Sequence, residues 1–316
     1  MSKAENILIT GAAGQLGVEL TAILRERYGA DSVITTDIRD NRAVSASGPF
    51  EKLDVLDSER LAGLVQRYRI GTIYHLAAIL SAKGEADIRW TWKLNMDGLL
   101  NVLEAARNPD ATASTRIKIF WPSSIAVFGP DLPREQTPQN SPLNPTTVYG
   151  ITKVAGEQLC AYYHRRFGVD VRSLRFPGLI GNKSEPGGGT TDYAVDMLRS
   201  AARREPFTCP LKPDTRLPMM YMDDAVKAAM MLMDAEAARV RVRTSYNITA
   251  MSFSPRELLD SIRLHVNGFE MDYRADHREQ IAASWPDSID DSDARRDWGW
   301  EPGFDLEAMV RKMLKS

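Results

Sequence analysis

The sequence predicts an α/β protein: a doubly wound, mostly parallel sheet with a smaller C-terminal lobe. Three observations predict this class. Short apolar, β-branched runs alternate with helix-like runs from the start of the chain. The first strand-like run passes directly into a glycine-rich loop, and the regular alternation stops after Phe176. Continuous apolar strands that alternate with helices are typical of a parallel sheet covered by helices on both faces.

The predicted elements follow one another in a regular order. The first strand, 6–10, precedes a helix whose apolar residues recur at helical spacing from Leu16 to Leu24 and which ends at Tyr28-Gly29. A short third strand ends at Asp54 and Val55. The other strands are predicted at 32–37, 72–78, 117–124, 170–176 and 245–249. The longer helices between them are predicted at 91–107 and 147–167.

The chain changes character after Phe176. The stretch "PGLIGNKSEPGGGTTDYA" is rich in glycine, and "CPLKPDTRLP" is rich in proline. We therefore predict a Rossmann-type domain from residues 1–177 and 219–250, and a smaller substrate-capping lobe from residues 178–218 and 251–316. Ligands are expected at the carboxyl ends of the strands, between the sheet and the cap.

Composition restricts the classes of partner. The chain has 316 residues and a formal net charge of −2, which gives no electrostatic reason to expect nucleic acid or an anionic membrane. Its two cysteines are too few for a disulfide framework, and no C-x-x-C metal pair occurs. No apolar run reaches 18 residues, and no signal-like segment precedes the first strand. We expect a cytoplasmic protein without a metal site; an organelle protein whose targeting segment has been removed is the alternative.

The loop "ITGAAGQLG" follows the first strand and opens the first helix, with Gly11, Gly14 and Gly17 at intervals of three. In this setting the glycines make a tight turn, admit a pyrophosphate and pack the helix on the sheet, while the helix N-terminus attracts the phosphates. Asp37 ends the second strand, where a carboxylate accepts hydrogen bonds from ribose hydroxyls. This predicts NAD rather than NADP, although Arg39 could accommodate a 2′-phosphate. The same predicted binding site includes the neighbouring residues Gln15, Leu16 and Ile38.

The hexapeptide "VYGITK" places Tyr149 and Lys153 on one face of a helix, at positions i and i+4. This spacing alone is typical of any amphipathic helix. It gains weight from "FWPSSIAVFG", because the carboxyl end of this strand lies beside the cofactor in a doubly wound sheet. Ser123 and Ser124 are therefore expected near the same site as the tyrosine.

Several motifs carry a family resemblance: "TGAAGQLG", "HLAA", "NMDGLLNVLEAA", "PSSIAVFG", "YGITK", "RFPGLIG" and "MYMDDA". In these motifs the chain resembles the extended short-chain dehydrogenase/reductase family, the nucleotide-sugar epimerase-like group. Within it, "AAILSAKGE", "PGGGTTDYAVDM", "PMMYMDDA" and "SWPDSIDDSDAR" are most similar to the L-threonine 3-dehydrogenases of the short-chain type. The similarity covers essentially the whole chain. Phe128 stands where many members have tyrosine.

The resemblance implies oxidation of an alcohol, with Tyr149 as the base. A free tyrosine has a pKa near 10, and a nearby ammonium favours the phenolate by roughly 1–3 pKa units. Lys153 would supply that ammonium and hold the nicotinamide ribose. Ser124 would orient the substrate hydroxyl, with Ser123 as the neighbouring candidate.

The implied substrate is L-threonine, oxidised at its β-hydroxyl to 2-amino-3-oxobutyrate. Its amino-acid groups would be bound by residues outside the tyrosine helix, namely Ser81, Thr190, Thr191 and Trp285, the last of which would cover the ligand or else only fill the core. Additional cofactor contacts are expected from Asp54, Val55, Leu76, Ala77 and Leu179. Asn95 is either structural or in direct contact with the ligand, and His75 is expected to be a packed histidine.

Two other functions are also compatible with the predicted fold. The first alternative is a nucleotide-sugar 4-epimerase or dehydratase of the same extended family, and the second is a nonenzymatic dinucleotide sensor. The tuned tyrosine argues against the sensor. The resemblance also suggests a homodimer formed through the helices at 91–107 and 147–167.

Overall fold

A computed structural model describes residues 5–107, 117–183, 185 and 187–315. Its main feature is a parallel sheet of seven strands in the order β10-β6-β5-β4-β1-β2-β3. The strands are β1 (Asn6–Thr10), β2 (Val33–Asp37), β3 (Phe50–Lys52), β4 (Ile70–His75), β5 (Lys118–Ser124), β6 (Asp170–Phe176) and β10 (Tyr246–Asn247). The order reverses between β1 and β4, where open α/β sheets bind their ligands. The predicted fold class is confirmed.

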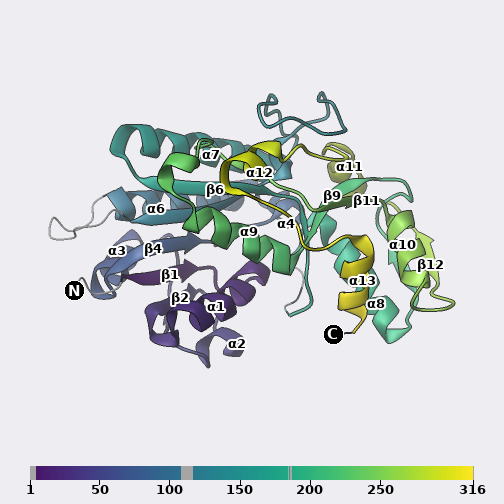
Figure 1. Cartoon of the computed structure of the whole chain (residues 1–316), viewed down its shortest axis with the longest axis horizontal. Helices are drawn as coiled ribbons and strands as arrows, with labels where there is room; N and C mark the ends of the chain where they lie inside the picture. Colours follow the sequence, from purple (N-terminus) through teal and green to yellow (C-terminus); the bar gives the residue numbers. More distant parts are fainter. Residues whose placement is uncertain (1–4, 108–116, 184, 186, 316) are drawn as a thin grey trace.

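Helices cover both faces of this sheet (Figure 1). One face carries α1 (Gln15–Tyr28), α9 (Met222–Asp234) and α12 (Ser292–Trp298), and the other carries α3 (Ser58–Arg67), α6 (Gly98–Arg107) and α7 (Val148–Phe167). A short helix, α2 (Arg42–Ser45), follows β2. Within β1, Ile7 and Ile9 pack on the face covered by α1, α9 and α12, whereas Leu8 packs on the face covered by α3, α6 and α7. This alternation explains why the strand reads as a continuous apolar run.

The predicted helix at 91–107 is interrupted in its first half. It consists of α5 (Ile88–Trp92), a π-helical turn (Lys93–Asp97) and α6. Asn95 lies in the π turn, accepts a hydrogen bond from the Ile79 N–H at 2.8 Å and donates one to the Thr152 hydroxyl at 3.1 Å. The wider turn thus brings a buried amide between the loop after β4 and helix α7. Such turns occur often at functional sites.

The smaller lobe contains the rest of the chain after β6. Its strands are β7 (Gly178–Ile180), β9 (Leu217–Tyr221) and β11 (Met251–Phe253) in one sheet, and β8 (Phe207–Cys209) and β12 (Met271–Tyr273) in another. Its helices are α8 (Tyr193–Arg203), α10 (Pro255–Arg263), α11 (His277–Ala283) and α13 (Leu306–Leu314). The apolar core of this lobe also includes Tyr149 and the turn 125–128 after β5. The lobe therefore packs directly against the carboxyl end of the large sheet.

Our division of the chain into two parts remains a proposal, and two packing details bear on it. Trp298 and Trp300 lie in the core formed by α1, α9 and the large sheet, so this C-terminal segment packs with the Rossmann part. Strand β9 pairs with β7 and β11 rather than with the large sheet.

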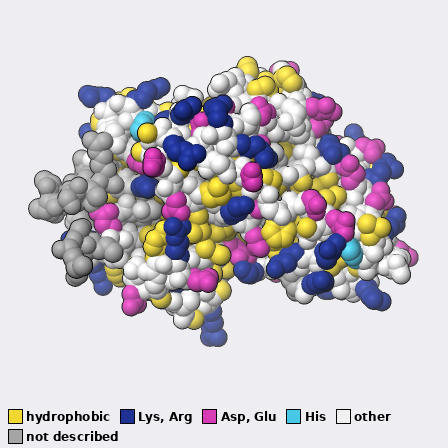
Figure 2. All heavy atoms as spheres, in the orientation of Figure 1, with side chains coloured by type: hydrophobic (Ala, Val, Ile, Leu, Met, Phe, Trp, Pro, Cys, Tyr) yellow, Lys and Arg dark blue, Asp and Glu magenta, His cyan; other side chains and the backbone are white. Residues whose placement is uncertain are grey.

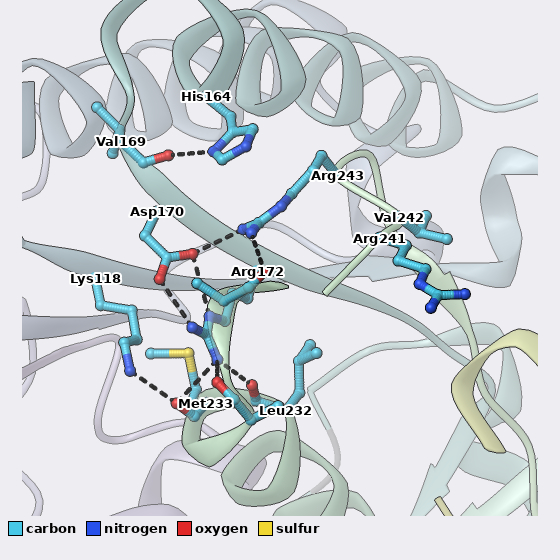
Figure 3. Close-up of polar contacts among 12 residues, drawn as sticks. Lys118, His164, Val169, Asp170, Arg172, Leu232, Met233, Arg241, Val242 and Arg243 are labelled. Carbon is cyan, nitrogen blue, oxygen red and sulfur yellow. Dashed lines mark hydrogen bonds and ion pairs between the residues drawn. The ribbon is translucent and has the colours of Figure 1, made fainter. Parts of the chain in front are cut away.

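A cluster of cations holds the C-terminal end of α9 at the amino ends of β5 and β6 (Figure 3). Lys118 donates to the Met233 carbonyl at 2.9 Å, and Arg172 donates to the Ala235 carbonyl at 2.6 Å. Asp170 pairs with Arg172 at 2.9 Å and with Arg243 at 2.8 Å. The last carbonyls of a helix lack partners within the helix and attract cations. This cluster anchors α9 at the edge of the sheet opposite the carboxyl ends of the strands.

The surface has two notable properties. Basic and acidic side chains are interspersed over the face shown in Figure 2, in keeping with the small net charge. Large apolar side chains are exposed on α5, α6 and α7, and α7 contacts each of the other two helices. We call these residues the apolar stripe: Ile88, Trp92, Leu100, Ile151 and Tyr162, each 40–60% exposed.

Two features are absent from the residues that the structure describes. None of their helices is both long enough and apolar enough to cross a membrane. No three of their His, Cys, Asp and Glu side chains are grouped so that they could hold a metal ion.

Candidate active site

The glycine loop forms a cradle between β1 and α1. Gly11 has φ 71°, and a Cβ there would lie 2.6 Å from the Ala77 nitrogen, so only glycine fits. A Cβ on Gly17 would lie 2.6 Å from the Gly11 carbonyl oxygen. A Cβ on Gly14 would meet only that oxygen, at 3.3 Å, so the remaining space beside this backbone is open. The cradle fits the approach of a pyrophosphate to the N-terminus of α1.

Gln15 adds a donor to this cradle. Its side-chain amide nitrogen is buried and has no hydrogen-bond partner among the described residues. A buried polar group without a partner is costly, so a ligand that accepts this hydrogen bond would stabilise the loop. Leu16, the next residue, packs against the core beneath α1. The residues present thus fit a dinucleotide.

Asp37 ties the glycine loop to the end of β2. Its carboxylate accepts hydrogen bonds from the backbone N–H groups of Ala13 and Arg39, both at 3.0 Å, and the residue is 7% exposed. A carboxylate has about four acceptor sites, so capacity remains for ribose hydroxyls. The Arg39 side chain is 75% exposed, and its guanidinium lies 4.0 Å from Asp37. Ile38 is exposed as well.

The remaining residues predicted to contact the cofactor follow the ends of neighbouring strands. Leu76 donates its N–H to the Thr10 carbonyl at 3.0 Å, after which Ala77 passes beneath Gly11. Strand β4 itself ends at His75 rather than at residue 78, because the chain turns there to form this crossing. Val55 is buried and Asp54 is exposed after β3. Leu179 lies half-buried in β7.

Helix α7 fixes the tyrosine and the lysine. The Thr147 hydroxyl caps the helix by accepting the Gly150 N–H at 3.0 Å, and Glu85 accepts the Val148 N–H at 2.8 Å. Lys153 is 3% exposed and donates from Nζ to the Pro122 carbonyl oxygen at 2.6 Å. This ammonium lies 5.5 Å from the centre of the Tyr149 ring. One helical turn thus brings phenol and ammonium together beside the end of β5.

The two serines at the end of β5 point to different partners. Ser124 accepts the Ala126 N–H at 3.2 Å and is hydrogen-bonded to Tyr149. Ser123 is buried and donates to Glu157 at 2.6 Å. Successive side chains of a strand face opposite ways. The structure therefore brings Ser124 to the tyrosine, while the hydroxyl of our second candidate, Ser123, is occupied by a buried carboxylate.

Burial controls the ionisation of this pair. It raises the pKa of Tyr149 to about 12, although the hydrogen bond with Ser124 lowers it. It lowers the pKa of Lys153 to about 8, while Cys160 and Glu157 raise it. The shift of the Tyr149 pKa is opposite to the lowering that we expected from Lys153. The cause is burial of the phenol, and the Lys153 ammonium donates its hydrogen bond to the Pro122 carbonyl oxygen.

The residues predicted to bind the substrate come from distant parts of the chain. The hydroxyls of Ser81 and Thr190, 109 residues apart, lie 3.1 Å from each other, and Ser81 also accepts the Thr190 N–H at 3.2 Å. Ser81 begins the short helix α4 (Ser81–Gly84), which contacts α7; a Cβ on Gly84 would lie 3.7 Å from the Tyr149 Cβ. Thr191 packs beside Gly178 in β7. Two of the four candidates, Ser81 and Thr190, are thus in direct contact, and the helix that begins at Ser81 contacts α7.

Trp285 is 4% exposed and lies in the core of the smaller lobe. Its neighbour Ser284 accepts a hydrogen bond from Thr146 at 3.0 Å, just before the start of α7. The tryptophan segment is therefore attached to the loop that leads to Tyr149. This placement is compatible both with a covering role and with core packing.

Three functional candidates were missed from the sequence: Glu85, Glu157 and Asp192. Asp192 accepts the N–H groups of Gly188 and Gly189 at 2.8 and 2.7 Å and so shapes the glycine segment beside Thr190. The spacing of Glu157, four residues after Lys153, was a usable signal. Glu85 and Asp192 contact backbone N–H groups, and no sequence pattern predicts these contacts. His75 is buried as expected, with its Nδ1 2.7 Å from the Thr10 hydroxyl.

Comparison with known proteins places this geometry in a family. The model of the NAD dependent epimerase/dehydratase family matches residues 7–249. An uncharacterized epimerase/dehydratase of Staphylococcus haemolyticus is 48% identical over 99% of this chain and 97% of its own length. A GalE-like L-threonine dehydrogenase from Cupriavidus necator, in its holo form, is 52% identical over 98% of this chain and 99% of its own, with a TM-score of 0.94.

A monomeric L-threonine 3-dehydrogenase from a metagenome, in its apo form, is 48% identical over 98% of this chain and 97% of its own, with a TM-score of 0.93. The similarity thus extends through the glycine cradle, the tyrosine helix and the smaller lobe. The chain belongs to the NAD-dependent epimerase/dehydratase family.

Proposed function

We propose that this protein is an NAD-dependent L-threonine 3-dehydrogenase that oxidises the β-hydroxyl of L-threonine to 2-amino-3-oxobutyrate. The observation that carries the proposal is the grouping of Ser124, Tyr149 and Lys153 at the carboxyl end of β5, two strands from the glycine cradle. The similarity to two L-threonine dehydrogenases, at 48% and 52% identity over nearly the whole chain, supports it.

The proposed cofactor contacts follow from the cradle. The N-terminus of α1 and the Gln15 amide would hold the pyrophosphate, and Asp37 would hold the adenosine ribose. Lys153 would hold the nicotinamide ribose. Leu76, Ala77, Asp54, Val55 and Leu179 would line the path between these points. NAD, when bound, accepts a hydride from the substrate carbon and places a positive charge beside the site.

Tyr149 would act as the general base for the substrate hydroxyl. With its pKa near 12, the phenol keeps its proton at neutral pH in the chain alone. Lys153, with a pKa of about 8, remains mostly protonated there and supplies positive charge to the phenolate. Ser124 would hold the substrate oxygen beside the Tyr149 oxygen, so that the proton moves directly between them. General-base catalysis of this kind typically contributes about 10²–10⁴-fold in rate.

The Ser81–Thr190 pair supports a small polar substrate. Two buried hydroxyls and a backbone N–H meet there, which suits the carboxylate or ammonium of a free amino acid. Thr191 would add a third hydroxyl, and Trp285 would exclude water from the ligand. Exclusion of water strengthens the electrostatic interactions within a site.

The epimerase alternative requires cations for a nucleotide diphosphate in the smaller lobe. The smaller lobe has three candidate arginines for this role, Arg203, Arg204 and Arg216, and two of them are paired with glutamates at the surface. Arg203 pairs with Glu205 and Arg216 pairs with Glu257, both at 2.7 Å. These pairs favour the amino-acid substrate. The test measures reduction of NAD by L-threonine against epimerisation of UDP-galactose.

We also propose that two copies of the chain pair through the apolar stripe. Five large apolar side chains exposed on contacting helices are costly in water, and a second copy would cover them. The metagenomic relative is described as monomeric, so the oligomeric state needs its own measurement.

A further inference from the structure

The catalytic face of α7 continues one turn beyond Lys153. Tyr149, Lys153 and Glu157 follow at intervals of four, so their side chains lie on one face of the helix. This face holds the last three residues of β5, 122–124. Tyr149 is hydrogen-bonded to Ser124, and Lys153 donates to the Pro122 carbonyl oxygen at 2.6 Å. Glu157 accepts a hydrogen bond from the Ser123 hydroxyl at 2.6 Å. Glu157 thus completes the attachment of the strand that carries Ser124.

Glu157 is also half of a buried ion pair. Its carboxylate accepts Nε of Arg175 at 2.9 Å and Nη2 at 2.8 Å, a bidentate arrangement. The side chains are 0% and 4% exposed. Arg175 further donates to the Gln139 carbonyl at 2.9 Å and to the Asn247 side chain at 3.1 Å. In this arrangement the guanidinium balances the charge of the carboxylate, and both groups have their hydrogen bonds satisfied in the interior.

We propose that Glu157 is a positioning residue for the reaction. Through Ser123 it fixes the strand end beneath Tyr149, and through its charge, balanced by Arg175, it keeps Lys153 protonated. The proposal rests on the roles of Tyr149 and Lys153 given above. Without the carboxylate, the buried guanidinium of Arg175, which lies opposite Ser123 in the register of β5 and β6, would stand uncompensated, and a positive potential disfavours a second cation.

Among the groups around Lys153, Glu157 is the carboxylate that favours its protonated form. On α7, Cys160 is buried, and burial raises the pKa of its thiol, so it is neutral. On β4, burial and the Lys153 charge lower the pKa of His75 to about 3, so it is neutral at physiological pH. Strand β5 offers only the Pro122 carbonyl and the Trp121 ring, 4.6 Å from Nζ. From α4, Glu85 faces the N-terminus of α7. Glu157 is the one carboxylate among the causes that raise the Lys153 pKa.

The test titrates Lys153 by NMR in protein labelled with ¹³C at lysine Cε, without substrate or cofactor. The signal is assigned by its absence in Lys153→Met. Glu157→Gln, which keeps a hydrogen bond to Ser123, is expected to lower the Lys153 pKa by roughly 1–3 units. The double variant Glu157→Gln/Arg175→Met removes both charges, and its Lys153 pKa is expected between the single variant and the parent.

The matched control is Asp170→Asn, which breaks the pair of Asp170 with Arg172 at the amino end of β6, away from the carboxyl end that carries Arg175. It is expected to leave the Lys153 pKa unchanged. An unchanged Lys153 pKa in folded Glu157→Gln overturns the proposal. A Lys153 pKa in the double variant that is equal to or below the pKa in Glu157→Gln also overturns it. If Glu157→Gln does not fold, a Lys153 pKa that is higher in the double variant than in the parent protein overturns the proposal.

Turnover gives a second, separable readout. The high-pH limb of the kcat profile with L-threonine is expected to move to lower pH in Glu157→Gln, in the same direction as the NMR titration. A purely structural defect would lower kcat at every pH and leave the limb in place. If the parent does not oxidise L-threonine, the proposed function fails, while the NMR titration still decides the role of Glu157.

Discussion

The Lys153 ammonium lies 5.5 Å from the centre of the Tyr149 ring and one helical turn further along α7. Burial nevertheless raises the pKa of the phenol to about 12, and the hydrogen bond of the ammonium goes to the Pro122 carbonyl oxygen. The tyrosine is therefore held as a protonated phenol until further positive charge arrives beside it. The relationship separates two roles, because Tyr149 would transfer the proton and Lys153 would tune that transfer.

Tyr149→Phe is expected to lower kcat with L-threonine by about 10²–10⁴-fold, because it removes the general base. NAD affinity, measured by isothermal titration calorimetry, should stay close to that of the parent. Tyr162→Phe, a change at an exposed tyrosine between three and four turns further along the same helix, serves as the control and should keep full activity. Near-parental turnover of Tyr149→Phe would show that another group takes the proton.

The buried lysine predicts a pH dependence of stability. The pKa of Lys153 falls from 10.5 to about 8 on folding, so between these values the unfolded chain binds more protons than the folded one. The free energy of unfolding should therefore rise with pH from about 8 to about 10.5, relative to Lys153→Met, by roughly 1–3 kcal/mol. Urea denaturation of both proteins across this range measures the difference. A parallel pH dependence for the two would mean that the Lys153 pKa is not lowered.

Asp37→Ala is expected to narrow the preference for NAD over NADP, mainly by weakening NAD. The carboxylate would accept ribose hydroxyls and repel a 2′-phosphate. The measurement is kcat/KM for both cofactors, with the exposed Asp40→Ala as the matched control. Equal kcat/KM for the two cofactors in the parent would remove the basis for this assignment.

Leu100→Glu in the apolar stripe is expected to convert a dimer into a 35.3 kDa monomer, because it would bury a charge at the interface. Sedimentation velocity at micromolar concentration measures this. Leu264→Glu, at a leucine that is 74% exposed on the smaller lobe, should leave the dimer intact. A parent protein that sediments only as a monomer would exclude pairing through the stripe under these conditions.

The features predicted well from the sequence depend on local spacing. The glycine loop occupies nine consecutive residues, and Tyr149 and Lys153 lie one helical turn apart, so short-range geometry places each group. Strand β5 was harder. Its period of two shows that only one of the two adjacent serines can face the tyrosine. The family resemblance put Ser124 first, and the contact of Ser123 with Glu157 supplies the physical reason, which the sequence pattern alone does not show.

The features that the sequence could not supply depend on tertiary contacts. The π turn at 93–97 forms where Asn95 meets Ile79 and Thr152, which are 16 and 57 residues away. The pairing of Ser81 with Thr190 spans 109 residues. The raised pKa of Tyr149 reflects burial by the smaller lobe, and a nearby ammonium in the sequence predicts the opposite direction.

The most direct test of the account follows absorbance of NADH when the protein is mixed with NAD and L-threonine. We expect NADH to form with L-threonine, much less with L-serine, which lacks the methyl group, and none with UDP-galactose. Epimerisation of UDP-galactose by the same preparation, without NADH formation from L-threonine, would contradict the account and favour the nucleotide-sugar alternative.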